Sequence, residues 1–308
     1  MTTQNLRSGV AVPASRWPAD ARSGGTFQAP DGVRLAVERV GAAHAPVLLF
    51  AHGFGQTRQA WRGAMHRLAA QGWQCVAFDA RGHGESGRVA GGAYHLAQFL
   101  EDLRALAEAQ RAPPVLVGAS MGGLLGIAVA GDRVRPPPFS ALALVDITPR
   151  WEPEGVARIL SFMRAHPDGF ADYAQAAQAI ADYLPQRGTR RSESRLRALL
   201  REGEDGRLRW HWDPALLDVV EAEGRTYQPA LLEATRHIRL PTLLLSGAAS
   251  DVVSDRTVAE FTALLPHAVH VRVAGATHML AGDANDAFIA ALGDFLRTLP
   301  GAPAGEPS

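Results

Sequence analysis

Short apolar runs alternate with stretches of helical periodicity along most of this chain, and no other feature of the sequence constrains its fold as strongly. We predict parallel strands at residues 47–51, 74–79, 114–118, 141–146, 242–247 and 270–273. We predict helices near residues 58–71, 94–110, 121–131, 255–265 and 284–298. A hairpin at residues 26–40 should come first, because Asp31-Gly32 accepts the positive φ of a tight turn. This alternation indicates an α/β fold with a mostly parallel twisted sheet flanked by helices.

The stretch between the fourth and fifth of these strands contains no strand-like run. Its apolar positions recur at helical spacing, for example at Val156, Ile159, Leu160 and Met163. We interpret residues 148–238 as a helical cap inserted into a core domain that residues 25–147 and 239–299 form. Residues 1–24 and 300–308 are rich in Pro, Gly, Ala and Ser, and we expect both ends to be poorly ordered.

The basic residues of the chain are all arginine, because the sequence contains no lysine. The missing amine excludes Schiff-base and pyridoxal chemistry. The 31 basic residues are dispersed along the chain and balanced by 31 acidic ones, which gives a formal net charge of zero. We therefore expect no nucleic-acid partner.

Metal chemistry, disulfides and membrane insertion are also disfavoured. The single cysteine, Cys75, allows no internal disulfide and no cysteine-based metal site. No group of residues has zinc-ligand spacing, so the predicted chemistry uses no metal and no cofactor. No apolar run approaches the ~20 residues of a membrane span, and the N-terminus lacks a hydrophobic signal core. We expect a cytoplasmic protein.

The strongest local signal for catalysis is the segment Gly118-Ala119-Ser120-Met121-Gly122-Gly123, which lies between a predicted strand and a predicted helix. A nucleophile at such a G-x-S-x-G turn sits in strained backbone, and its small neighbours let the strand and the helix approach each other. The following helix also points its free N–H groups at developing negative charge. We predict that Ser120 is a catalytic nucleophile.

A serine nucleophile needs a base, which in turn is oriented by a carboxylate. Our candidate base is His278, because its loop follows the last predicted strand at the carboxyl edge of the sheet, where sites of open α/β sheets lie. We expect other histidines to be surface residues or hydrogen-bonded core residues, namely His66, His166, His211, His237 and His267.

Two residues are candidates for the acid. Asp251 follows the strand at 242–247, and Asp146 closes the strand at 141–146. The order Ser120, Asp251, His278 places the serine first, the acid second and the histidine last. We favour Asp251, because Asp146 introduces the cap and could instead cap a helix or brace the loop.

An oxyanion hole requires two backbone donors aimed at the reacting carbonyl oxygen. We assign one to the Met121 N–H, directly after the nucleophile. The other should come from the glycine-rich loop His52-Gly53-Phe54-Gly55-Gln56, where we choose the Phe54 N–H. We expect His52 itself to bond to neighbouring backbone and not to act as a base.

Five segments, HGFGQT, FDARGHGES, GASMGG, SGAASD and GATHML, occur in an order and at intervals that resemble the α/β-hydrolase superfamily in its capped, serine-esterase-like branch. The resemblance covers about residues 25–298 and implies the α/β-hydrolase fold. It implies a triad of Ser120, Asp251 and His278, with Phe54 and Met121 as oxyanion donors.

The same resemblance implies a mostly structural role for the loop at residues 79–86. Epoxide hydrolases and haloalkane dehalogenases of this fold carry an aspartate nucleophile, so Ser120 argues against both activities. Related serine members act as acyltransferases, perhydrolases, carbon–carbon bond hydrolases and hydroxynitrile lyases, and some similar proteins are slow-turnover ligand receptors. The triad does not separate these activities from one another.

Our leading interpretation is a cofactor-free serine hydrolase whose partner is a small, largely apolar carboxylic ester, with thioesters or lactones as further substrates. Pockets for small molecules are mainly apolar and often lie between domains, so cap side chains should line this one. The candidate pocket residues are Trp151, Phe162, Trp210 and Trp212. The sequence carries no indication of an oligomeric state.

Overall fold

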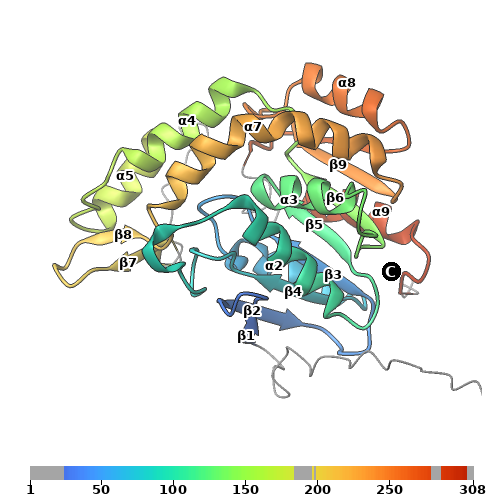
Figure 1. Ribbon diagram of the computed structural model, residues 1–308, viewed down its shortest axis with the longest axis horizontal. Coiled ribbons are helices and arrows are strands. Elements are labelled where there is room, and N and C mark those ends of the chain that lie inside the picture. Colours follow the sequence, from blue (N-terminus) through green and yellow to red (C-terminus); the bar gives the residue numbers. More distant parts are fainter. Residues whose placement is uncertain (1–23, 184–195, 198, 279–285, 304–308) are drawn as a thin grey trace, which may run out of the picture.

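The computed structural model describes residues 24–183, 196–197, 199–278 and 286–303 (Figure 1). At its centre is an eight-stranded sheet with the strand order β1-β2-β4-β3-β5-β6-β9-β10. The strands are β1 (Gly24–Gln28), β2 (Arg34–Val40), β3 (Val47–Ala51), β4 (Gln74–Phe78), β5 (Val115–Ala119), β6 (Ala141–Val145), β9 (Thr242–Gly247) and β10 (Val269–Val273). The β1–β2 and β2–β4 pairs are antiparallel, and all other neighbouring pairs are parallel.

Helices cover both faces of the sheet, and β4, β5, β6 and β9 are therefore buried along their whole length. Strands buried on both faces have continuous apolar sequences, which is why the sequence predicts them well. One face is covered by α1 (Arg62–Ala69) and α9 (Asp286–Arg297). The other is covered by α2 (Leu96–Glu108), α3 (Met121–Ala130), α7 (Leu216–His237) and α8 (Asp255–Leu264). The predicted α/β fold is confirmed.

Short 3-10 helices and capping residues set the ends of several helices. The 3-10 turn η1 (Arg58–Trp61) leads into α1, and η2 (Ala90–Gly92) precedes α2. Ser254 caps α8, because its side chain accepts a hydrogen bond from the Thr257 N–H, as an N-terminal serine typically does.

The chain between β6 and β9, which we call the inserted segment (residues 148–238), forms its own group of elements to one side of the sheet (Figure 1). These elements are α4 (Pro153–Arg164), α5 (Tyr173–Tyr183), β7 (Leu200–Glu202), β8 (Leu208–Trp210) and α7. The antiparallel β7–β8 hairpin was not expected from the sequence. The later part of α7 packs on α3, since a Cβ at Gly131 would lie 2.1 Å from the Ala234 carbonyl oxygen.

The two ends expected to be poorly ordered lie largely outside the described residues, although Gly24 already begins β1. Residues 184–195 and 198 of the predicted cap also lie outside them.

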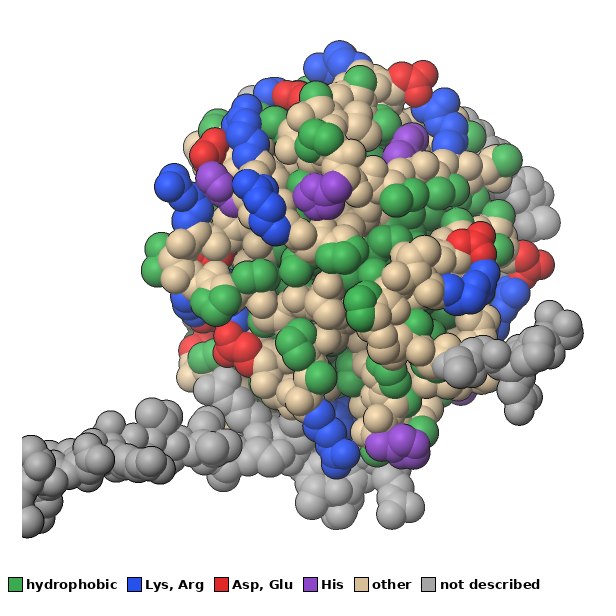
Figure 2. Space-filling view, turned by 90° about the vertical axis from the view of Figure 1, so that its right-hand side faces the viewer, with side chains coloured by type: hydrophobic (Ala, Val, Ile, Leu, Met, Phe, Trp, Pro, Cys, Tyr) green, Lys and Arg blue, Asp and Glu red, His purple; other side chains and the backbone are tan. Residues whose placement is uncertain are grey.

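Charged side chains on the face shown in Figure 2 are interspersed with apolar ones and do not gather into a region of one sign. Such a distribution accords with the equal numbers of basic and acidic residues in the chain. Of the helices that the structure describes, none has both the length and the apolar character needed to cross a membrane.

Candidate active site

Ser120 lies at the sharp turn between β5 and α3. Its backbone has φ 45° and ψ −116°, a conformation that non-glycine residues rarely adopt. The turn can be tight because the residues two positions before and after Ser120, Gly118 and Gly122, have no side chains. A Cβ at Gly122 would lie 2.3 Å from the Ala51 carbonyl oxygen, and a Cβ at Gly118 would lie 2.7 Å from the Gly122 backbone. The two glycines therefore allow the close approach that the sequence predicts.

His278 forms a hydrogen bond with Asp146, with 2.8 Å between His278 Nδ1 and Asp146 Oδ2. Asp146 Oδ2 also accepts the Ser250 hydroxyl at 2.6 Å, and Asp146 Oδ1 accepts the Gly247 N–H at 2.7 Å. Because an ionised carboxylate only accepts, Nδ1 of His278 carries the proton, and Nε2 of the neutral ring is free to accept one. Three donors thus hold the carboxylate, and the carboxylate orients the imidazole.

The carboxylate that contacts His278 is Asp146 and not Asp251, the acid that we favoured from the sequence. Asp251 instead forms an ion pair with Arg158 of α4. β6 and β9 are neighbours in the sheet, so the loops that carry the two acids leave from the same edge. The local backbone decides which of them faces His278, and the order of residues along the chain does not reveal it.

Backbone strain singles out two of these residues. Among the described non-glycine residues, positive φ occurs only at Ser120 (45°) and Asp146 (50°). Such conformations cost of the order of 1–3 kcal/mol each and cluster at functional sites. Both strained residues lie in the loops that carry the candidate catalytic side chains. This supports a role for Asp146, which the order of residues along the chain does not indicate.

The two predicted oxyanion donors lie beside the nucleophile. Met121 follows Ser120 directly, and Gly53, next to Phe54, is so close that a Cβ there would lie 3.2 Å from the Ser120 Cβ. Within the described residues, neither the Phe54 N–H nor the Met121 N–H has an acceptor in the chain. Two free donors near a serine are what an oxyanion hole needs.

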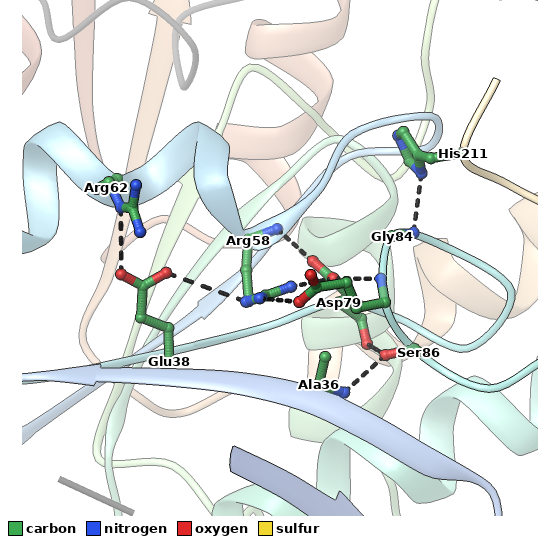
Figure 3. A network of polar contacts seen from close by, with 9 residues as sticks. Ala36, Glu38, Arg58, Arg62, Asp79, Gly84, Ser86 and His211 are labelled. Carbon is green, nitrogen blue, oxygen red and sulfur yellow. Dashed lines mark hydrogen bonds and ion pairs between the residues drawn. The ribbon is translucent and has the colours of Figure 1, made fainter. Parts of the chain in front are cut away.

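The loop after β4 is organised around the buried Asp79 (Figure 3). The Asp79 carboxylate accepts from the Arg58 N–H at 2.7 Å, from the Arg58 guanidinium and from the Glu85 N–H at 2.9 Å. The Ser86 hydroxyl donates to the Asp79 carbonyl at 2.6 Å and accepts from the Ala36 N–H at 2.9 Å. These contacts join β2, the loop and η1, as expected of a structural loop.

Three buried histidines, His52, His83 and His211, surround the turn at residues 52–57. His52 bonds to neighbouring backbone as expected, because its ring contacts the Gly53 carbonyl at 2.8 Å and accepts from the Ala80 N–H at 2.9 Å. Across the described part of the chain, no three His, Cys, Asp or Glu side chains are grouped so that they could hold a metal ion.

A cavity of about 980 Å³ is lined by Ser120 and His278 together with side chains of α2, α3, α4 and α7. Most of its lining is apolar. Its charged lining residues are Arg164, Glu221 and Glu223, and the first two form an ion pair with each other. The inserted segment and the sheet domain thus enclose one largely apolar space beside the candidate catalytic residues.

Of the four aromatic residues expected in the pocket, Trp151 lines the cavity. The other three do not belong to its lining but pack on one another. The ring centroids are 5.7 Å apart for Phe162 and Trp210, and 6.5 Å apart for Trp210 and Trp212. Trp212 also packs against Phe54, at 5.8 Å. These three residues therefore form an aromatic cluster within the inserted segment, beside the turn that carries Phe54.

The chain belongs to the alpha/beta hydrolase fold family, whose model matches residues 46–284. It is therefore a member of a hydrolase family. The chain is similar to a 3-hydroxybutyrate-oligomer hydrolase of Cupriavidus necator, with 28% identity over 251 residues that cover 77% of this chain and 83% of the relative.

Solved structures show the same fold. E-2-(acetamidomethylene)succinate hydrolase matches with a TM-score of 0.76 and 23% identity, covering 89% of this chain and 98% of its own. The thioesterase domain from the curacin biosynthetic pathway matches with a TM-score of 0.71 and 26% identity, covering 90% of this chain and 99% of its own.

Proposed function

We propose that this protein is a serine hydrolase that cleaves small, largely apolar carboxylic esters through an acyl-enzyme on Ser120. One observation carries the proposal. Ser120, whose backbone is strained, and His278 line the same apolar cavity, and His278 is already bonded to the buried and strained Asp146. Nucleophile, base and acid are thus available beside a space that suits an apolar substrate.

In the proposed reaction, Ser120 Oγ attacks the ester carbonyl carbon while His278 Nε2 takes the hydroxyl proton. The oxygen of the tetrahedral intermediate accepts from the Phe54 and Met121 N–H groups. When the carbon–oxygen bond breaks, His278 gives its proton to the leaving alcohol. Water then attacks the acyl-enzyme and passes a proton to His278, and the carboxylic acid leaves as Ser120 regains its proton. Asp146 stays ionised and stabilises the imidazolium in both steps.

The cavity supports an apolar substrate with room for several carbons. Its volume is near the upper end of the ~300–1,000 Å³ typical of small-molecule pockets. On α3 its lining includes Met121, Leu124 and Ala128, so the cavity follows that helix for about 10 Å at 1.5 Å per residue. The curated relative named as a hydrolase supports hydrolysis, and the thioesterase domain supports testing thioesters beside esters.

The test is covalent labelling combined with turnover. A fluorophosphonate should add one group per chain at Ser120, and the wild type should hydrolyse p-nitrophenyl esters continuously. Ser120→Ala should lose both properties, whereas Ser161→Ala, at another serine of the cavity wall, should still be labelled. Labelling at a different serine, or an active Ser120→Ala, would refute the proposal. A single stoichiometric burst without sustained release would instead indicate a slow-turnover ligand receptor.

A further inference from the structure

The turn that carries the Phe54 N–H is held by three histidines from three separate parts of the chain. Each histidine holds a different one of three consecutive peptide groups, those joining residues 53–54, 54–55 and 55–56. The contacts are Gly53 O with His52 Nδ1 (2.8 Å), Gly55 N with His83 Nε2 (3.2 Å) and Gly55 O with His211 Nε2 (3.3 Å). The direction of the Phe54 N–H is thus fixed through these rings.

All three rings must be neutral to make these contacts. In each ring one nitrogen accepts a backbone N–H, from Ala80 to His52 (2.9 Å), from Gly55 to His83 (3.2 Å) and from Gly84 to His211 (2.8 Å). The other nitrogen therefore carries the proton and donates to a carbonyl. Burial lowers the pKa of all three, and it lowers the pKa of His211 to about 3.

His211 differs from the other two because it belongs to the inserted segment, between β8 and α7. It is 3% exposed and reaches Gly84 in the loop after β4 (Figure 3). Its neighbours in the inserted segment touch the same turn. Trp212 packs on the Phe54 ring, and a Cβ at Gly55, whose φ is 72°, would lie 2.5 Å from Met163 Cε. Glycine at position 55 lets the inserted segment approach this closely.

We propose that His211 is a positioning residue through which the inserted segment sets the oxyanion hole. The inference rests on the proposed function, in which the Phe54 N–H stabilises the oxyanion. Oxyanion donors work because they are aimed before the reaction begins, and an error of about 1 Å in such a site can cost about 100-fold in rate. Without the His211 bond, the Gly55–Gln56 peptide can rotate. Its Gln56 N–H then leaves the Gly53 carbonyl (3.1 Å), which belongs to the same peptide group as the Phe54 N–H, and that N–H can turn away. The hole is then complete only while the inserted segment is docked on the sheet domain.

Three substitutions separate the two hydrogen bonds of the ring. His211→Ala removes both. His211→Gln places an amide N–H near the position of Nε2 and can restore the bond to the Gly55 carbonyl. His211→Asn places an amide oxygen near the position of Nδ1 and can restore only the bond from Gly84. The matched control is His166→Asn, because His166 also lies in the inserted segment but packs on Phe170, with 4.5 Å between ring centroids.

Kinetics on p-nitrophenyl esters give the first readout. His211→Ala should lower kcat about 10- to 100-fold and leave KM within about threefold, because the missing interaction acts in the transition state. The affinity for a trifluoromethyl ketone, which forms an anionic adduct with Ser120, should fall by the same factor as kcat/KM. His211→Gln should recover most of the loss and His211→Asn little of it, while His166→Asn behaves as wild type. Wild-type kcat in His211→Ala, or equal recovery by Gln and Asn, would overturn the proposal.

Amide hydrogen exchange measured by NMR gives a readout that does not depend on activity. Losing the ring removes the acceptor of the Gly84 N–H in any case. Only a positioning role also predicts faster exchange at Gly55, whose own acceptor, His83, is intact. If the wild type hydrolyses no ester, the proposed function fails, and unchanged exchange at Gly55 in His211→Ala separately overturns the positioning role.

Discussion

Replacing Asp146 with asparagine removes an acceptor that three donors share. The Asp146 carboxylate accepts from His278 Nδ1, the Ser250 hydroxyl and the Gly247 N–H. Asparagine keeps one acceptor oxygen and brings an NH₂ group that only donates. If the amide oxygen stays opposite Gly247, the NH₂ group faces His278. The imidazole then moves its proton to Nε2, and it can no longer take the proton of Ser120.

The expected loss in kcat is about 10⁴-fold, the size found when a triad aspartate becomes asparagine with the geometry intact. KM should change little, because Asp146 is not part of the cavity lining. The loss in stability is about 2–3 kcal/mol. It corresponds to the lost hydrogen bond from the Ser250 hydroxyl to a charged acceptor, because that hydroxyl already accepts from the Val252 and Val253 N–H groups and has no lone pair left for the new NH₂.

Asp251→Asn is the matched control. Its partner Arg158 is 55% exposed and Asp251 is 31% exposed, and ion pairs exposed to this extent contribute about 0–1 kcal/mol. Its kcat should stay within about threefold of wild type. The assay is steady-state hydrolysis of a p-nitrophenyl ester, with circular dichroism and thermal unfolding to verify that both variants fold. If Asp251→Asn loses activity by orders of magnitude and Asp146→Asn keeps it, the assignment of the acid to Asp146 is wrong.

Two further predictions concern the cavity and the buried histidines. Ala128→Phe should lower kcat/KM for octanoyl esters at least about tenfold while acetyl esters stay within about twofold, because each excluded methylene is worth about 1–3 kcal/mol. Trp151→Ala should shift the preference toward bulkier esters. The assay for both variants is hydrolysis of a series of p-nitrophenyl esters. If both keep the wild-type ranking of these esters, selectivity arises outside this cavity. Stability should fall on acidification below about pH 6.5, because His52, His83 and His211 are neutral when folded and gain protons on unfolding. The pKa of each histidine is lower in the folded state than in the unfolded state, where it is about 6.5. The contribution of these histidines to stability is therefore fully present above about pH 6.5. It is lost as the pH falls toward the pKa of the folded state, which is about 3 for His211. Each histidine changes the free energy of unfolding by up to about 1.4 kcal/mol per pH unit. Urea unfolding between about pH 7.5 and 5.5 should therefore show a smaller slope of this free energy against pH in His211→Gln than in the wild type. An equal slope would contradict this account.

The sheet could be predicted from the sequence because its strands are buried on both faces. A strand such as Val115–Ala119 is an uninterrupted apolar run after Pro113-Pro114, and its residues are all buried. The hairpin of the inserted segment could not be recognised in this way. β7 and β8 have three residues each, and charged residues interrupt both. The signal that the sequence did offer was the dipeptide Asp205-Gly206 between them, which is typical of a tight hairpin turn.

Periodicity shows which side chains are buried, but not which surface buries them. Trp210 and Phe162 lie in apolar surroundings, as their positions suggest, yet those surroundings are Phe170 and other parts of the inserted segment. Trp151 could be placed at the cavity because it follows β6 closely, on the edge where Ser120 and His278 also emerge. His211 illustrates the same limit, since a single histidine in a sequence gives no indication of the turn that it holds.

The position of Asp146, the proposed acid, follows from how Ser120, the proposed nucleophile, is anchored. The Ser120 N–H donates to the carbonyl of Val145 in β6 at 3.1 Å. Asp146, which follows Val145, donates its own N–H to the carbonyl of Leu245 in β9 at 2.7 Å. The two strained residues are therefore consecutive anchor points on the β5–β6–β9 ladder, and the parallel hydrogen bonds of three buried strands oppose the relaxation of either one. A carboxylate at the end of β6 is fixed relative to Ser120 by the sheet itself. Asp251 lies beyond the end of β9, and its side chain is paired to Arg158 of the inserted segment. A rigid connection between nucleophile and acid is what a preorganised site requires, and in this fold β6 provides it.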